Sequence, residues 1–408
     1  MKILFLSDNF PPEVNAPATR TYEHCVEWVK QGADVTVITG FPNFPHGKVY
    51  EGYSNRWKQV EWMEGIKVIR VWTYISANKG FYRRTLDYIS FSVTAFFAGL
   101  FEKTHIIVAT SPQFFTALSG RTLAFWKRKP WIMEVRDLWP ESIKTVGAMK
   151  DNLFIRYFEK EEKWCYQSAS RIVVVTDSFK EEIVKKGIPA RKIKVIKNGS
   201  NTALFQPQPK DPSLLSKLNL EQKKVLGYIG THGMAHRLDF ILDCAKAMKD
   251  SHPDFHFLLI GNGAEKEKLL QKVQEEGISN VTMLDSVPKE KVVQYLSLLD
   301  AAIINLRKSD LFKTVIPSKI FETAAMEIPI LLGVDGEARS IVEQYEAGLF
   351  YEPENQPDFI DKVNLLFSGN GEMAKLKEGC AVLARDFDRK KLAAEKLEMI
   401  EKTVMYRP

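Results

Sequence analysis

Residues 198–212 read NGSNTALFQPQPKDP, a segment rich in Asn, Gln and Pro that has no helical period. Such a composition is typical of the linkers that separate domains. On both sides of the segment, short apolar runs alternate with helix-length amphipathic stretches, which predicts parallel strands covered by helices. The sequence therefore predicts an α/β protein of two Rossmann-like domains, each with a doubly wound parallel sheet.

The length of the chain supports the same division. Its 408 residues exceed the roughly 250–300 at which a single hydrophobic core stops growing. We place the first domain at residues 1–198 and the second at residues 199–387, and a terminal helix of about residues 388–408 can pack back onto the first domain. A composition of 45% hydrophobic and 26% charged residues is that of a folded globular protein and excludes a disordered chain.

Strand-like runs recur in both halves with room for helices between them. In the first domain we expect strands at Lys2–Ser7, Asp34–Thr39, His105–Ala109, Trp131–Val135, Arg171–Val175 and Ile193–Ile196, with an added hairpin at Val60–Trp72. In the second domain we expect them at Lys224–Tyr228, His256–Ile260, Val281–Leu284, Ala301–Asn305, Ile330–Leu332 and Gly348–Tyr351. One of the intervening helices is expected to begin at Ser178, which forms a capping box with Glu181.

No segment has the form of a secretory signal or a membrane span. No basic region and cleavage site precede the strand-like run Lys2–Leu6, so we expect a cytoplasmic protein. The longest apolar run, Ile89–Phe101, has 13 residues, fewer than the roughly 20 that span a bilayer. The cysteines are far apart and fall in helix-like segments, so buried thiols are expected rather than disulfides or a zinc site. They are Cys25, Cys165, Cys244 and Cys380.

Ligands of open parallel sheets bind outside the carboxyl ends of the strands, so the loops there are the candidate sites. In the first domain, residues 7–20 (SDNFPPEVNAPATR) include Asn15 and Ala16, small residues that allow a ligand close to the backbone at a helix start. Residues 134–142 (EVRDLWPES) place Arg136 and Asp137 beside a tryptophan directly after a strand. An ordinary proline-rich loop and a structural Arg–Asp pair are the alternatives.

Three further loops follow strands of the second domain. Residues 227–237 (GYIGTHGMAHR) combine glycines, histidines and an arginine, which suits a phosphate, although histidines are often structural. The candidates there are Gly230, Thr231, His232, Gly233, His236 and Arg237. Residues 260–266 (IGNGAEK) offer Gly261 and Gly263, but Lys266 replaces the third glycine of a dinucleotide fingerprint, so NAD is not expected. In residues 315–322 (VIPSKIFE), Ser318 is a candidate N-cap, and Lys319 and Glu322 share one helix face as a site or as a solvated ion pair.

Residues 317–355 (PSKIFETAAMEIPILLGVDGEARSIVEQYEAGLFYEPEN) resemble the donor-binding segment of family 4 glycosyltransferases of GT-B fold, whose two domains face a cleft. The resemblance extends over essentially the whole chain. It implies that Glu322 binds the ribose of the donor and that the loop Gly336, Glu337, Ala338 and Arg339 cradles its diphosphate. Within the family, the chain looks closest to transferases of bacterial surface-polysaccharide assembly, including the N-acetyl-L-fucosamine transferase type.

The chain departs from the family pattern at the donor loops. The first glutamate of the E-x7-E signature corresponds to Thr314, and the usual donor-loop Arg and Lys correspond to Thr231 and His236. Arg237 and Lys319 are therefore the expected diphosphate cations.

The first domain departs from the pattern as well. The usual Gly-Gly of its first loop is Asn15-Ala16, and the histidine frequent near the acceptor is replaced by Arg136-Asp137. The expected catalytic set is therefore Arg136 and Asp137 together with the two cations of the second domain.

The resemblance implies transfer from a UDP-sugar with retention, in which the donor's phosphate accepts the acceptor proton. Positive side chains and helix N-termini can stabilise the leaving diphosphate, and the D-x-D at residues 386–388 lies in the helical tail, so no metal cofactor is expected. The alternatives are a nucleotide-sugar epimerase of the same fold and a non-catalytic nucleotide-sugar-binding protein. A dehydrogenase is the least supported alternative.

Residues 56–130 hold 12 Lys/Arg against 4 Asp/Glu, an excess of eight positive charges. Cations alternate with aromatic rings at Phe81–Arg84 and Phe125–Trp131, a mixture that suits an anionic membrane surface. The expected partners are thus a nucleotide-sugar donor, a polyprenyl-diphosphate-linked sugar acceptor and the inner leaflet. The alternative is a core helix beside a solvated face. Nucleic acid is not expected, because the pI is only about 8.8 and no binding motif is present.

Overall fold

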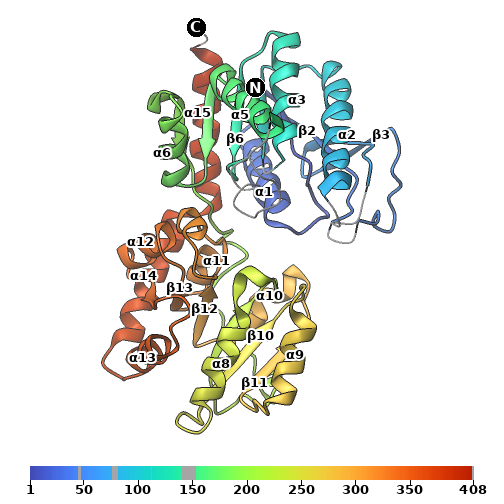
Figure 1. Cartoon of the computed structure of the whole chain (residues 1–408). Coiled ribbons are helices and arrows are strands. Elements are labelled where there is room, and N and C mark those ends of the chain that lie inside the picture. The colour runs from blue at the N-terminus through green and yellow to red at the C-terminus, as the bar shows by residue number, and fades with distance from the viewer. Residues whose placement is uncertain (45–46, 76–80, 112, 140–152, 407–408) are drawn as a thin grey trace. The chain divides into compact units, whose positions relative to one another are not determined.

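The computed structural model describes residues 1–44, 47–75, 81–111, 113–139 and 153–406. The chain divides into two compact units, one formed by residues 1–197 with 389–408 and the other by residues 198–388 (Figure 1). The linker segment that the sequence indicates lies at the start of the second unit and leads into a short helix, α7 (Pro212–Lys217).

The first unit contains an eight-stranded sheet in the order β3-β4-β2-β1-β5-β6-β7-β8. All neighbours are parallel except the edge strand β3, which pairs with β4 in the expected hairpin. The strands are β1 (Lys2–Leu6), β2 (Asp34–Gly40), β3 (Lys58–Met63), β4 (Ile66–Val71), β5 (Ile106–Thr110), β6 (Trp131–Val135), β7 (Arg171–Val174) and β8 (Ile193–Val195). The strand order reverses between β1 and β5, which places the ligand-binding crevice of this unit at their carboxyl ends.

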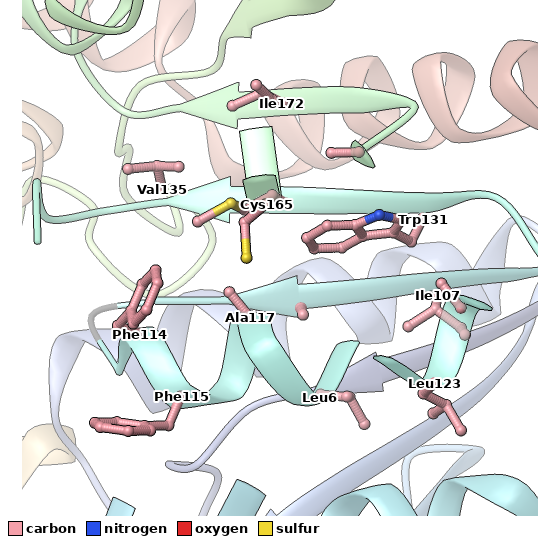
Figure 2. Close-up of a cluster of buried hydrophobic side chains, with 14 of the residues drawn as sticks. Leu6, Ile107, Phe114, Phe115, Ala117, Leu123, Trp131, Val135, Cys165 and Ile172 are labelled. Carbon is pink, nitrogen blue, oxygen red and sulfur yellow. The ribbon is translucent and has the colours of Figure 1, made fainter. Parts of the chain in front are cut away.

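Helices cover both faces of this sheet. They are α1 (Ala16–Lys30), α2 (Phe81–Leu100), α3 (Phe114–Lys127), α5 (Leu153–Ser168), α6 (Asp177–Lys185) and α15 (Arg389–Met405). Because side chains alternate along a strand, Leu4 and Leu6 of β1 face the layer of α2, α3, α5 and α6, whereas Ile3 and Phe5 face α1 and α15. Figure 2 shows part of the first of these two cores. None of the described helices combines the length and the apolar character that crossing a bilayer requires.

The terminal helix α15 belongs to the first unit although it follows the second in sequence. It packs against α1, where the Trp28 indole Nε1 donates a hydrogen bond to the Ala393 carbonyl oxygen (2.8 Å). Leu392, Leu397 and Ile400 are buried in the same core.

The second unit contains a six-stranded sheet, parallel throughout, in the order β11-β10-β9-β12-β13-β14. Its strands are β9 (Lys224–Ile229), β10 (Phe255–Ile260), β11 (Val281–Leu284), β12 (Ala301–Asn305), β13 (Ile330–Gly333) and β14 (Gly348–Phe350). Its helices are α8 (Leu238–Met248), α9 (Lys266–Glu275), α10 (Lys289–Leu296), α11 (Lys319–Ala325), α12 (Glu337–Gln344), α13 (Gln356–Leu366) and α14 (Glu372–Asp386). The order reverses between β9 and β12, so the loops after these two strands flank the crevice.

The predicted fold class is confirmed, since both units are doubly wound and each expected strand is present. The four thiols are buried and free, as expected. The capping box at Ser178 is wrong: helix α6 begins one residue earlier, and the hydroxyl of Thr176 accepts the capping hydrogen bond from the Phe179 amide (3.1 Å).

Candidate functional site

The loops after β9 and β10 are in direct contact at the carboxyl edge of the second sheet. The His232 amide donates to the Asn262 carbonyl oxygen (3.0 Å), and the Glu265 amide donates to the His232 carbonyl oxygen (2.9 Å). A Cβ atom at Gly261 would lie 1.8 Å from the Gly230 carbonyl oxygen, and one at Gly263 would lie 2.4 Å from the His232 carbonyl oxygen. Gly261 and Gly263 are therefore needed for packing of the two loops, a role that differs from the predicted contact with a ligand.

Lys319, the first residue of α11, extends across the loop after β9. A Cβ atom at Gly230 would lie 2.3 Å from both Cε and Nζ of Lys319, and this ammonium nitrogen is 5.2 Å from the centroid of the Tyr228 ring. Burial lowers the pKa of Lys319, and the carboxylate of Glu322 acts in the opposite direction. No carboxylate oxygen of the described residues forms an ion pair with Lys319 within 4.0 Å. The sheet crevice thus contains a largely desolvated cation without a close counterion, which is what an anionic ligand requires.

Glu322 lies one turn further along α11 and is half-buried, although its neighbours Phe321 and Thr323 are fully buried. Glu322 and Lys319 line a small cavity of about 30 Å³ together with apolar side chains of β9 and α10. The predicted placement of both residues on one helix face is thus observed. Ser318 occupies the N-cap position of α11, as predicted, but its side chain makes no capping hydrogen bond.

The two histidines of the loop are neutral near pH 7. Burial, followed by the charge of Lys266, lowers the pKa of His232 to about 4. Burial, followed by the charge of Lys319, lowers the pKa of His236 to about 4. Neither imidazole adds positive charge to the crevice, although each ring lies about 6 Å from that of Tyr228, at 6.0 and 5.7 Å between centroids.

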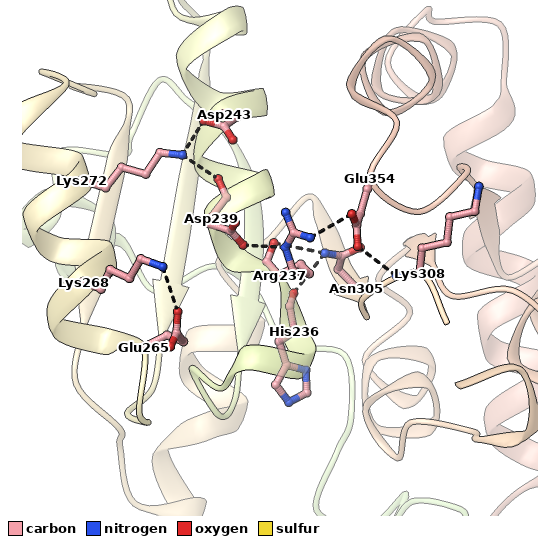
Figure 3. A network of polar contacts seen from close by, with 10 residues as sticks. All are labelled: His236, Arg237, Asp239, Asp243, Glu265, Lys268, Lys272, Asn305, Lys308 and Glu354. Carbon is pink, nitrogen blue, oxygen red and sulfur yellow. Dashed lines mark hydrogen bonds and ion pairs between the residues drawn. The ribbon is translucent and has the colours of Figure 1, made fainter. Parts of the chain in front are cut away.

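Arg237 does not have the position expected of a diphosphate cation. Its Nε lies 3.0 Å from Asp239 Oδ1 and its Nη1 lies 2.9 Å from Glu354 Oε2 (Figure 3). The side-chain amide of Asn305 donates to the carbonyl oxygens of His236 (3.0 Å) and Arg237 (3.3 Å). The guanidinium is therefore already paired with two carboxylates. These contacts indicate that Arg237 stabilises the conformation of the loop. Of the two predicted cations of the second unit, Lys319 is thus the one without an ion pair among the described residues.

The loop after β13 approaches the loop after β12 closely. Gly336 has a positive φ of 81°, and a Cβ atom there would lie 2.2 Å from the Lys313 carbonyl oxygen. The Ala338 side chain is in the core, so the predicted contact of this residue with a diphosphate concerns its backbone. Arg339 lies 2.8 Å from Glu343 and 4.0 Å from the centroid of the Phe350 ring. Helix α12 starts at Glu337 with Gly336 as its N-cap, and the amide groups at a helix start can bind a phosphate.

Three remaining positions of the second unit are simple to place. Thr231 is exposed and its carbonyl oxygen accepts a hydrogen bond from the Tyr228 hydroxyl (2.8 Å). Thr314, which stands where the family has a glutamate, donates to the Leu311 carbonyl oxygen (3.1 Å). Gly233 has space around its Cα, since a methyl group added there would have its nearest neighbour 3.6 Å away, on the Thr231 side chain.

In the first unit, the loop after β1 is organised by Asn15. Its Oδ1 accepts a hydrogen bond from the Ala18 amide (2.9 Å), which caps α1, and its Nδ2 donates to Asn9 Oδ1 (2.7 Å). Ala16 is exposed as the first residue of the helix. The small residues of this loop therefore form the capped start of α1. The predicted close approach of a ligand would be to the backbone of this loop.

The loop after β6 begins at Arg136, whose amide donates to the Ser111 hydroxyl (2.8 Å). The Nε and Nη1 atoms of its guanidinium are buried and have no hydrogen-bond partner in the described part of the chain. Trp139 stacks on Phe114 with 4.8 Å between ring centroids, which explains why a tryptophan is present in this loop. Asp137 follows Arg136 in the loop and is half-buried. Pro140, Glu141 and Ser142 of the predicted loop lie outside the described residues.

A buried ion network behind this loop was not apparent from the sequence. Glu134 Oε1 is 3.2 Å from Arg20 Nε and 2.9 Å from Lys396 Nζ, and all three side chains are at most 2% exposed. Arg20 also donates to the Ile196 carbonyl oxygen (3.0 Å). Lys396 belongs to α15 and Glu134 to β6, so 262 positions separate the paired residues in sequence. The network fixes the strand from which the loop starts.

A cluster of acids on the same edge was also missed. Burial raises the pKa of Asp8 well above its ordinary value, and its Oδ2 accepts a hydrogen bond from the Gln113 amide nitrogen (2.6 Å). Burial likewise raises the pKa of Asp87 to about 7. No group of three His, Cys, Asp or Glu side chains that could hold a metal ion is found within the described residues.

Two doubly wound units, each with its crevice at the carboxyl edge of a parallel sheet, have the architecture of the GT-B fold. The chain consists of two glycosyltransferase domains: residues 212–380 match the model for glycosyl transferases group 1, and residues 15–199 match that for the glycosyl transferase 4-like domain.

The relatives are transferases of surface polysaccharides. The chain is 25% identical over 355 residues to the putative colanic acid biosynthesis glycosyl transferase WcaI of Escherichia coli, a match that covers 85% of this chain and 84% of that protein. It is 26% identical over 247 residues to the putative teichuronic acid biosynthesis glycosyltransferase TuaH of Bacillus subtilis, a match that covers 59% of each. Among solved structures, HepE of Anabaena in complex with UDP has the same fold, with a TM-score of 0.69 and 14% identity over 98% of this chain and all of that one.

Proposed function

We propose that this protein is a retaining glycosyltransferase that moves an N-acetylated hexosamine or deoxyhexosamine from a UDP-sugar to a polyprenyl-diphosphate-linked sugar, in the synthesis of a bacterial O-antigen or capsule. The observation that carries the proposal is the position of Lys319. Its ammonium lies over the backbone of Gly230 at the reversal point of the second sheet, where nucleotides bind in this kind of fold.

The donor contacts follow from the chemistry of the crevice. The ammonium of Lys319 binds the diphosphate, and the carboxylate of Glu322, one helical turn away, accepts hydrogen bonds from the ribose hydroxyls. The backbone of Gly230 allows a phosphate close to the loop, since it has no side chain. The start of α12 at Glu337 offers amide groups to the same anion.

The reaction breaks the bond between the anomeric carbon and the phosphate oxygen. Negative charge grows on the leaving UDP, and the cation of Lys319 stabilises it, an effect that is strong in a desolvated site. The acceptor hydroxyl attacks from the face that the phosphate leaves, and its proton passes to a phosphate oxygen, so the configuration of the sugar is retained. We propose that no metal ion is needed, because Lys319 supplies the positive charge.

The relatives support the choice of donor and pathway. WcaI and TuaH are named for the synthesis of colanic and teichuronic acid, and the HepE structure contains UDP. An epimerase would share the donor site, but the family of both units favours transfer to an acceptor.

A lipid-linked acceptor agrees with an exposed apolar stripe on α2. Five side chains spaced by three or four residues lie on one face of this helix, and each is at least 40% exposed: Leu86, Ile89, Val93, Phe97 and, directly after its last residue, Phe101. At the end of α3, Phe125 and Trp126 are 80% and 68% exposed. We propose that this surface, with the neighbouring cations Arg83 and Arg84, contacts the inner leaflet of the membrane as a peripheral site.

The proposal is tested by screening UDP-sugars for thermal stabilisation of the protein and then assaying the best donor with synthetic polyprenyl-diphosphate sugars. We expect a product only when both are present. Isomerisation of the UDP-sugar without acceptor would establish the epimerase, and donor binding without turnover on any acceptor would indicate a binding protein.

A further inference from the structure

The guanidinium of Arg136 is in an unusual electrostatic position. Its Nε and Nη1 are buried and donate to no described oxygen atom, although the side chain is permanently charged. Buried N–H groups without a hydrogen-bond partner are unfavourable, and a ligand, an ion or ordered water commonly explains them.

The surroundings of Arg136 are mainly cationic. Burial lowers its pKa to about 9, the charge of Arg20 acts in the same direction, and Arg389 adds a smaller effect of the same sign. Glu134 is the carboxylate that opposes this, but its Oε1 is already 3.2 Å from Arg20 and 2.9 Å from Lys396. Within the described part of the chain, Glu134 is therefore shared with two other cations and does not pair closely with Arg136.

The cations form one connected cluster. His24 is buried between them, and the charges of Arg20, Lys396 and Arg389 all lower its pKa, after burial as the first cause. Arg389 lies 3.3 Å from Glu23. The described charged side chains of this cluster include the cations Arg20, Arg136, Arg389 and Lys396 and the carboxylates Glu23 and Glu134. An anion that binds Arg136 would thus be attracted by more than one charge.

We propose that Arg136 is the anion-binding residue of an acceptor subsite in the first unit, and that its ligand is the diphosphate of the lipid-linked sugar. The residue follows β6 at the carboxyl edge of the sheet, where ligands of this architecture bind. A guanidinium offers two parallel N–H groups to a phosphate, and the Nε and Nη1 of Arg136 have no hydrogen-bond partner among the described residues. The inference rests on the proposed acceptor, because the donor's diphosphate is assigned to Lys319 in the other unit.

The test uses inorganic pyrophosphate as the probe, titrated calorimetrically into the full-length protein with UDP at saturation. We expect the wild-type protein to bind pyrophosphate under these conditions and Arg136→Met to bind it at least tenfold more weakly. Arg136→Lys should be intermediate, since it keeps the charge but not the paired N–H groups. The control is Arg171→Met. It removes the same charge at the first residue of β7, at the amino ends of the strands and thus away from the carboxyl edge.

A second measurement separates ligand binding from a structural role. Because Arg136 is buried without a hydrogen-bond partner at Nε and Nη1, Arg136→Met should melt at the same temperature as the ligand-free wild type or higher, whereas the loss of a structural arginine lowers it. Three outcomes would overturn the proposal: a lower melting temperature, equal pyrophosphate affinity of variant and wild type, or pyrophosphate binding that saturating UDP abolishes. The last would assign Arg136 to the donor. Retained UDP binding by Arg136→Met would leave the glycosyltransferase proposal itself intact.

Discussion

Lys319 and Gly230 are fitted to each other: Cε and Nζ of the lysine lie 2.3 Å from the point where a side chain at the glycine would begin. The glycine also has a φ of 154°, which L-residues rarely adopt. A methyl group at this position would displace the flexible end of Lys319, and it would also strain the backbone at this φ. The pair thus gives a way to move the ammonium without removing it.

We predict that Gly230→Ala weakens UDP binding about tenfold, the loss of one charge-assisted contact of roughly 1.4 kcal/mol. Calorimetry with UDP measures it. The matched control is Gly233→Ala in the same loop, where φ is −111° and the nearest neighbour of a methyl is 3.6 Å away. Equal affinities of the two variants would show that the position of Lys319 does not matter for UDP.

Glu322→Gln should weaken UDP binding by about tenfold or more, because a hydrogen bond to a charged group contributes roughly 1.5–3 kcal/mol. The affinities of the variant for UMP, uridine and pyrophosphate show which part of the ligand Glu322 contacts. The affinity should fall for every ligand that contains ribose and stay unchanged for pyrophosphate. Glu343→Gln on the exposed face of α12 removes the same charge and serves as the control. An unchanged affinity for uridine would contradict the ribose contact.

Arg237→Met should act on stability rather than on catalysis. Its guanidinium is 32% exposed and binds Asp239 and Glu354, so we expect a cost below about 1 kcal/mol and a fall in melting temperature of a few degrees. The kcat at saturating donor should stay within about threefold of wild type, whereas Lys319→Met should lose about a hundredfold. A large loss of kcat in Arg237→Met alone would restore the sequence-based assignment of this residue.

Membrane contact should depend on both the apolar stripe and the cations. The double variant Phe97→Asp/Phe101→Asp should no longer co-sediment with anionic liposomes at low salt. Its UDP binding should be unchanged, because both rings are exposed and are not part of the core. Charge reversal of the cation set should have the same effect. The set is Arg83, Arg84, Lys127, Arg128 and Lys129.

The control for this experiment reverses Lys217 and Lys268, which are exposed in the second unit. If the wild-type protein does not sediment with such liposomes, a water-soluble acceptor replaces the lipid-linked one.

The sequence predicts the fold well because its signals are local. Alternating apolar runs locate the strands of both sheets, and a parallel sheet with helices on both faces follows from their spacing. The error at α6 has a local cause too, since Thr176 and Ser178 are both good caps and only the structure shows which hydroxyl meets the Phe179 amide.

The site could be predicted only in part, because partners distant in sequence decide the role of a charge. Arg237 looked like a free cation, but Glu354 lies 117 positions away and binds it. Likewise, Lys396 reaches Glu134 only because α15 returns to the first unit. The shared helix face of Lys319 and Glu322 could be predicted from sequence because both lie on one turn of one helix, where spacing alone sets their geometry.

Retaining transfer from a UDP-sugar without a metal ion is tested most directly by the anomeric configuration of the product. This configuration is read by NMR from a reaction of the wild-type protein with donor, polyprenyl-diphosphate sugar and excess EDTA. We expect a glycoside with the configuration of the donor, formed at the rate observed without EDTA. An inverted product, or transfer that EDTA stops and Mg²⁺ or Mn²⁺ restores, would contradict metal-free retention.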